Sequence, residues 1–354
     1  MAANIEGISA GLRKSLRHRS ERDLRNREGV QNLVNAQNLK KMLLQQYEGH
    51  SLDDVFSGAI ASNSYGEFYE IRSQNSMIFS KPDHHHAISL LSRSLPVLYG
   101  IRSKIAKKLI KQGYETIQDL TCHPRWKFNA LEVVKLIRDQ NSEALIELYG
   151  QRFGNSHPLL LATSAFPQTQ DFRVIDIETL GFPPSPLFLI GIANLTPQEL
   201  DVRQILAQDL ADEPAVVGEC LKEFTTSSAI LSFNGRSFDI PYILGRIAYY
   251  GLPKPPINLH FDLLHFSRRY WRNKVANCKL GTLEREILAV KRVMDLPSSL
   301  VPAFYQSYLK EQNPGPLVPI INHNRQDLIS LVEIFNLLCK GIKLTSKSEI
   351  ISRP

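Results

Sequence analysis

The chain has 354 residues, of which 43% are hydrophobic and 22% charged, with a formal net charge of +7 and a pI near 9.1. This composition is that of an ordinary soluble protein with room for two domains, and the basic balance favours a polyanionic partner. Its four cysteines are scattered without a Cys-x-x-Cys pair, which argues against a zinc knuckle or a disulfide framework and predicts a reducing compartment. The sequence contains neither an apolar run of membrane-spanning length nor the apolar core of a signal peptide, so we expect a cytoplasmic protein with no membrane partner.

The first 50 residues are polar and predict a helix-prone or disordered arm. Between Ala10 and Val30 the arm holds seven Lys and Arg residues against three acidic ones. A solvated helix explains this pattern, and so does a flexible basic arm that adds non-specific affinity for nucleic acid. Residues 51–154 predict a small, mostly helical domain.

Within residues 95–120, the stretches Gly100–Leu109 and Gly113–Leu120 resemble a helix-hairpin-helix element. In that element, backbone N–H groups at a helix N-terminus meet a phosphate. Arg102 stands where the motif usually has a second glycine. The second helix would carry three candidate phosphate contacts: Lys104, Lys107 and Lys108. A plain helical packing module with a solvated lysine face explains the same residues, so both interpretations stay open.

A linker is predicted at residues 155–170, an α/β domain at 171–345 and a tail at 346–354. Apolar runs in the α/β domain predict strands at Phe172–Ile177, Leu187–Ala193, Val202–Leu206 and Ala229–Phe233. Helices are predicted at residues 212–226 and at Phe238–Tyr250. Three consecutive strands followed by alternating helix and strand predict a mixed sheet.

Acidic residues stand at two predicted strand ends. Asp176 and Glu178 lie two apart on the first strand, so both carboxylates share a face while Ile177 faces the core. Asn234 opens a strand-to-helix turn, the kind of place where α/β sheets bind ligands, and Asp239 begins the helix that follows. Each feature alone also fits an ordinary surface strand or an acid favoured at a helix N-terminus.

A third segment places His323 four residues before Asp327, on one face of a predicted helix. A carboxylate beside an imidazole suits water activation at a metal site, because the imidazole titrates near neutrality. A plain helix start capped by Asn322 or Asn324 explains the same residues. Four converging carboxylates are costly unless cations meet them, and two divalent ions would also suit displacement at phosphorus.

Together the three segments resemble the DEDD exonuclease group of the ribonuclease H-like superfamily. Residues 172 to about 340 are similar, more specifically, to the YprB-type ribonuclease H-like domain family, which has segments similar to Asp262–His265, Arg268–Trp271 and Leu280–Glu284. The resemblance implies an α/β fold with a mixed five-stranded sheet flanked by helices. It also implies a 3′–5′ exonuclease that hydrolyses single-stranded DNA in DNA repair, with two Mg²⁺ or Mn²⁺ ions and a helicase partner.

The resemblance implies four metal ligands: Asp176, Glu178, Asp239 and Asp327. It makes His323 the candidate general base, although this group has either a tyrosine four residues before the last Asp or a histidine five before it, where this chain has Asn322. Candidate substrate contacts at the site are Asn234, Thr179 and Arg268, of which Arg268 also fits a solvated helix face. A structure-selective endonuclease, an RNA exonuclease and a non-catalytic nucleic-acid-binding module remain alternatives.

Overall fold

The computed structural model describes residues 33–292 and 296–343. These residues divide into two compact units, one from residues 33–55 and 296–321 and one from residues 56–292 and 322–343. No helix in these ranges combines the length and the apolar character that crossing a membrane requires. The basic part of the expected arm and the expected tail at 346–354 lie outside the described residues.

The smaller unit is helical. It contains a helix over residues 33–46, α2 (Leu52–Val55), α12 (Val301–Glu311) and the beginning of α13 (Leu317–Lys343). Asn313 Nδ2 donates to the carbonyl oxygen of Leu44 at 2.9 Å. A Cβ on Gly315 would lie 2.5 Å from the carbonyl oxygen of Leu43, so this close backbone approach requires a glycine.

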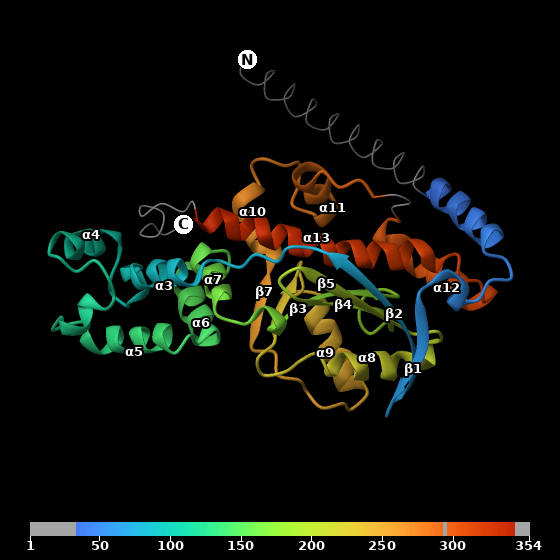
Figure 1. Ribbon diagram of the computed structural model, residues 1–354, viewed down its shortest axis with the longest axis horizontal. Helices are drawn as coiled ribbons and strands as arrows, with labels where there is room; N and C mark the ends of the chain where they lie inside the picture. The colour runs from blue at the N-terminus through green and yellow to red at the C-terminus, as the bar shows by residue number, and fades with distance from the viewer. Residues whose placement is uncertain (1–32, 293–295, 344–354) are drawn as a thin grey trace, which may run out of the picture. The chain divides into compact units, whose positions relative to one another are not determined.

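The larger unit is built on one seven-stranded sheet with the order β1-β2-β5-β4-β3-β6-β7 (Figure 1). Its strands are β1 (Gly58–Asn63), β2 (Gly66–Ser76), β3 (Phe172–Thr179), β4 (Leu187–Leu195), β5 (Glu199–Leu206), β6 (Ala229–Ser232) and β7 (Leu259–Asp262). β3 runs antiparallel to β4 and parallel to β6, so the sheet is mixed. The expected α/β fold class is confirmed.

The sheet has two strands more than the five expected. Residues 58–76, which the sequence placed in a mostly helical domain, form the antiparallel pair β1 and β2. β2 then pairs with β5 from Tyr69 opposite Leu206 to Ser76 opposite Glu199. β2 gave a weak local signal because most of its residues are polar, and its partner strand is distant in sequence.

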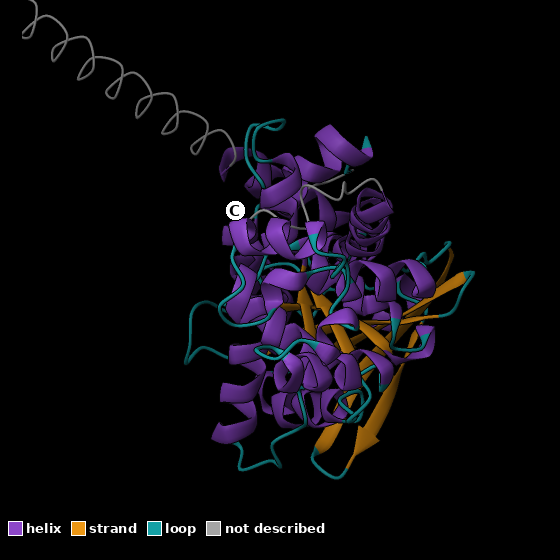
Figure 2. Ribbon diagram, turned by 90° about the vertical axis from the view of Figure 1, so that its left-hand side faces the viewer, coloured by secondary structure: helices purple, strands orange, loops and turns teal. Residues whose placement is uncertain are grey.

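Helices cover both faces of the sheet (Figures 1 and 2). On one face α13 packs against β3, where the rings of Phe172 and Phe335 lie 5.8 Å apart between centroids. On the other face lie α8 (Glu213–Leu221) and α9 (Asp239–Tyr249). Because alternate residues of a strand share a face, Asp176 and Glu178 lie on the α13 side with Phe172.

Residues 84–162 form a helical part of the larger unit. Its helices are α3 (His84–Ser92), α4 (Ser103–Lys111), α5 (Lys127–Arg138), α6 (Ser142–Phe153) and α7 (Pro158–Ala162). Tyr149 is fully buried here, and its hydroxyl donates to the carbonyl oxygen of Leu91 at 2.8 Å. The segment expected to be a linker, residues 155–170, contains α7, in which Leu159, Leu160 and Leu161 are buried.

Candidate active site

The first pair of acids lies at the end of β3, next to the central strand β4. Asp176 is half-buried and Glu178 is buried, and a register shift follows between Glu178 and Thr179. The remaining positions of β3 are mostly apolar and buried, which anchors the strand in the core. The two carboxyl groups are therefore held on rigid backbone and face α13.

Asn324 holds Asp176 in place. It is fully buried on α13, and its Nδ2 donates to Asp176 Oδ2 at 2.8 Å and to the Asp176 carbonyl oxygen at 3.2 Å. Gln204 Nε2 in turn donates to Asn324 Oδ1 at 2.8 Å. The strand residue opposite Asp176 is Gly191, where a Cβ would lie 2.2 Å from Asn324 Oδ1. The amide of Asn324 thus occupies space that only a glycine leaves open.

The second acidic segment is the turn from Asn234 to Asp239, and Asp262 holds its backbone in place. Its carboxylate accepts hydrogen bonds from the backbone N–H of Asn234 at 2.8 Å and of Arg236 at 3.1 Å. Asn234 has φ +67°, a left-handed conformation that asparagine tolerates better than most residues. Asp239 then begins α9, in the place expected from the sequence, and it is buried.

The third segment lies inside α13, which starts at Leu317 and not near Asn322 as a cap would require. The interpretation of Asn322 or Asn324 as an N-cap is therefore wrong, since the helix begins earlier and Asn324 bonds to Asp176. Asp327 is buried, and its Oδ2 lies 3.6 Å from Nε2 of His323. Both side chains share a face of the helix, as their spacing predicts.

The guanidinium group of Arg292, which the sequence did not predict to be part of the site, contacts Asp327 in this third segment. Arg292 donates to Asp327 Oδ1 and forms two bonds with buried Glu284, at 2.6 and 2.7 Å. Ser330 donates to the same Glu284 carboxylate at 2.5 Å. Glu284 begins a short π-helical segment, Glu284–Leu288, after α11 (Leu280–Leu283). Arg292 therefore supplies the positive charge that two buried carboxylates need.

Arg292 also fixes the proton on His323. Its Nη1 lies 2.7 Å from His323 Nδ1. Because a guanidinium only donates, Nδ1 must accept this bond, so the proton of the neutral ring is on Nε2, facing Asp327. With this tautomer, the lone pair of Nδ1 is engaged by Arg292. To take a proton from water, His323 would have to give up its contact with Arg292 at Nδ1 or change its tautomer.

Burial and mutual repulsion set the charges of the four acids. Burial raises the pKa of Asp176 well above its usual value, and the charges of Asp327, Asp239 and Glu178 add to the rise. Burial likewise raises the pKa of Glu178 to about 8 and that of Asp239 to about 7. Burial also raises the pKa of Asp327, against the opposing effects of His323 and Arg292. The four carboxyl groups are close enough to repel one another, so the site attracts cations.

The donor chemistry fits hard divalent cations. Carboxylate oxygens are the ligands that Mg²⁺ and Mn²⁺ favour, and the carboxyl groups of Asp327, Asp239 and Glu178 repel that of Asp176. Within residues 33–292 and 296–343, however, no three His, Cys, Asp or Glu side chains stand in an arrangement that could hold an ion. Asp327 is engaged by Arg292 instead. A cation that used Asp327 would therefore compete with this guanidinium.

The remaining candidates fall in two groups. Asn234 lies in the turn that follows β6, and Thr179 is the last residue of β3, where its hydroxyl donates to the Gly181 carbonyl oxygen at 2.8 Å. Arg268 is exposed near the end of α10 (Leu263–Trp271). The three candidate lysines, Lys104, Lys107 and Lys108, are exposed on α4, which belongs to the helical part and not to the edge of the sheet.

With Asp176 as a candidate metal ligand, Asn324→Ala is expected to lower turnover about 10- to 100-fold, which is what partners that orient a metal ligand typically contribute. The change removes both hydrogen bonds to Asp176 and leaves Gln204 without its acceptor. Single-turnover rates measured with saturating metal test this effect. Asn322→Ala is the matched control, since Asn322 is exposed two residues away. Equal rates for the two variants would contradict the role of Asn324.

Arg292→Gln is expected to lower the free energy of unfolding of the metal-free protein by about 3 kcal/mol, because it removes the cation that is paired with buried Glu284. Chemical denaturation in a chelator measures this change. Lys291→Gln alters an exposed neighbour and serves as the control. Adding Glu284→Gln to Arg292→Gln should restore part of the loss, and a double variant no more stable than the single one would refute the pairing.

Comparison with known proteins supports the fold. Residues 174–339 match the model of a family described as the RNase_H superfamily. The chain is also similar to the uncharacterized protein YprB of Bacillus subtilis (strain 168), with 33% identity over 205 residues, which are 56% of this chain and 48% of that protein. The chain thus spans about half the length of the curated relative it matches. Residues 174–339, which contain the four acids and His323, form a domain of the ribonuclease H superfamily.

Proposed function

We propose that the chain is a metal-dependent nuclease that hydrolyses phosphodiester bonds. The observation that carries this proposal is the proximity of four carboxyl groups whose pKa values are raised, above all by burial. Such an arrangement is costly for a fold and useful for holding cations. Its position at the ends of β3 and β6 and on α13, within a ribonuclease H superfamily domain, supports the same activity.

In the proposed mechanism, Asp176, Glu178, Asp239 and Asp327 would hold the metal ions. Two bound Mg²⁺ or Mn²⁺ ions would supply a clamp on the attacking and leaving oxygens of an in-line displacement. His323 would accept the proton of the attacking water once Arg292 no longer engages its Nδ1. Asn234 and Thr179 would contact the nucleotide, because Thr179 ends the strand that carries Asp176 and Glu178, and Asn234 lies in the turn between β6 and Asp239.

The finer assignment rests on the resemblance of the sequence to DEDD exonucleases. It makes the enzyme a 3′–5′ exonuclease of single-stranded DNA that acts in DNA repair, with a helicase as a possible partner. The exposed lysines of α4 support a nucleic-acid substrate, because phosphate contacts supply non-specific affinity. Absence of any helicase after affinity capture from cells would contradict the proposed partner.

The activity test uses the full chain with single-stranded DNA labelled at either end, in Mg²⁺, in Mn²⁺ and in a chelator. The proposal expects metal-dependent release of nucleoside monophosphates, with stepwise shortening of the 5′-labelled strand. It also expects circular single-stranded DNA to stay intact. Cleavage of the circle would identify an endonuclease, and preference for RNA an RNA exonuclease. Binding without metal-dependent turnover would identify a non-catalytic module.

A further inference from the structure

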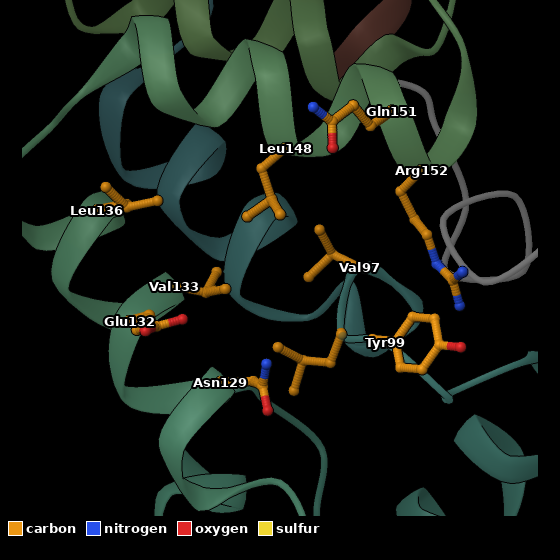
Figure 3. Close-up of a pocket in the computed structure, with 10 residues that line it drawn as sticks. Val97, Tyr99, Asn129, Glu132, Val133, Leu136, Leu148, Gln151 and Arg152 are labelled. Atoms are coloured by element: carbon orange, nitrogen blue, oxygen red, sulfur yellow. The ribbon is translucent and has the colours of Figure 1, made fainter.

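A pocket of about 350 Å³ lies in the helical part of the larger unit, between the segment before α4 and helices α5 and α6 (Figure 3). Its apolar lining comes from five side chains: Val97, Leu98, Val133, Leu136 and Leu148. Polar side chains also line it, with Asn129 and Glu132 on α5 and Gln151 and Arg152 on α6. An apolar pocket with a few polar groups is typical of a ligand site, and the volume lies near the small end of the roughly 300–1,000 Å³ range.

Tyr99 lines the pocket on a firmly held backbone. The Trp126 indole N–H donates to the Tyr99 carbonyl oxygen at 3.2 Å. Arg152 donates to the carbonyl oxygens of Pro96 at 2.6 Å and Ile101 at 3.0 Å, one on each side of Tyr99. The tyrosine itself is nevertheless 86% exposed. A large aromatic side chain is thus presented to solvent from a fixed position beside a pocket.

The charge around the pocket favours a polyanion. Residues 84–166 contain eleven Lys and Arg residues against six Asp and Glu, a net charge of +5 out of +7 for the whole chain. α4 begins at Ser103, four residues after Tyr99, and its Lys104, Lys107 and Lys108 are exposed. Phe128, next to Asn129 on α5, is 78% exposed. Exposed aromatic rings among cationic side chains are the means by which proteins bind single strands, with stacking on bases and charge on phosphates.

We propose that this pocket takes one unstacked base of a single-stranded nucleic acid, with Tyr99 stacking on the base and the α4 lysines contacting neighbouring phosphates. The amides of Asn129 and Gln151 both donate and accept, and Glu132 accepts, so the lining can meet the polar edge of a base. This assignment rests on the proposed function, because it gives the nuclease a second point of attachment to its substrate.

The test measures binding by fluorescence anisotropy in a chelator, so that no hydrolysis occurs. Each protein is titrated with a labelled single-stranded oligonucleotide and with an abasic strand of the same length and charge. Tyr99→Ala is expected to weaken binding of the base-bearing strand about tenfold and to leave binding of the abasic strand unchanged. Tyr99→Phe keeps the ring and should retain the parent affinity. Lys107→Glu should weaken binding of both strands.

Tyr249→Ala is the matched control, because Tyr249 is an exposed tyrosine at the end of α9. The proposal is overturned if Tyr99→Ala binds the base-bearing strand as tightly as the parent, or loses affinity for both strands equally. It is also overturned if the parent binds no single strand, as expected if the pocket serves a protein partner. If the pocket proposal is overturned, metal-dependent hydrolysis that requires Asp176 would still support the proposed nuclease. If no hydrolysis is found, base-dependent binding through Tyr99 would still support the proposed pocket.

Discussion

Replacing Asp176 with Asn is expected to slow phosphodiester hydrolysis about a thousandfold or more, which corresponds to about 4 kcal/mol of lost transition-state stabilisation. The amide keeps the shape of the side chain and its bond with Asn324 but cannot carry the charge that holds a cation. In a chelator, the same variant is expected to unfold at a higher temperature than the parent, because a carboxyl group that three neighbouring acids repel is gone. Activity and stability should therefore change in opposite directions.

Single-turnover rates in Mn²⁺ and thermal unfolding in a chelator measure the two effects. Glu67→Gln removes an exposed acid from β2 and should change neither quantity. A rate for Asp176→Asn within tenfold of the parent would refute its place in the reaction. A fall in unfolding temperature would instead show that Asp176 stabilises the metal-free fold.

The metal-free protein is expected to lose several kcal/mol of stability as the pH rises from about 4 to about 8. Burial raises the pKa of Glu178 to about 8 and that of Asp239 to about 7, whereas both types of group ionise near pH 4 in an unfolded chain. Between these values the folded protein retains protons that the unfolded chain has released. Raising the pH therefore favours unfolding, and the effect ends above pH 8, where both states are ionised.

Unfolding in a chelator across this pH range, for the parent and for Asp239→Asn, measures the effect. The variant should lose less stability than the parent between pH 4 and 7, because it lacks one titrating carboxyl. Mn²⁺ should raise the unfolding temperature of the parent most above pH 7, since cations bind the deprotonated ligands. Parallel pH profiles for parent and variant would contradict the raised pKa of Asp239.

The sequence predicted the parts of the site that local patterns determine. The strand with Asp176 and Glu178, and the turn before Asp239, follow from apolar runs and turn residues read over a few positions. Spacing also placed His323 and Asp327 on one helix face. Each of these inferences needs only the period of a strand or a helix.

The remaining parts depend on contacts between distant segments. Arg292 lies outside the helices and strands, and nothing around it in sequence indicates that it meets Glu284 and Asp327. Asn324 had an ordinary explanation as a cap, and its role emerges only when Gly191 on β4 is seen to leave space for its amide. β1 and β2 likewise join the sheet through pairing with a strand far along the chain. Such contacts leave no periodic signal.

In the proposed metal-dependent nuclease, a cation built into the chain would let the fold form before any metal arrives. Without Arg292, Glu284 and Asp327 would bring unpaired charges together during folding, and the newly made protein would depend on the supply of divalent ions. With Arg292 in place, folding and metal uptake would be separate events, and a metal ion bound at Asp327 would replace the positive charge of Arg292 there. The apo-protein should accordingly be a well-folded species that can be purified and then loaded with metal.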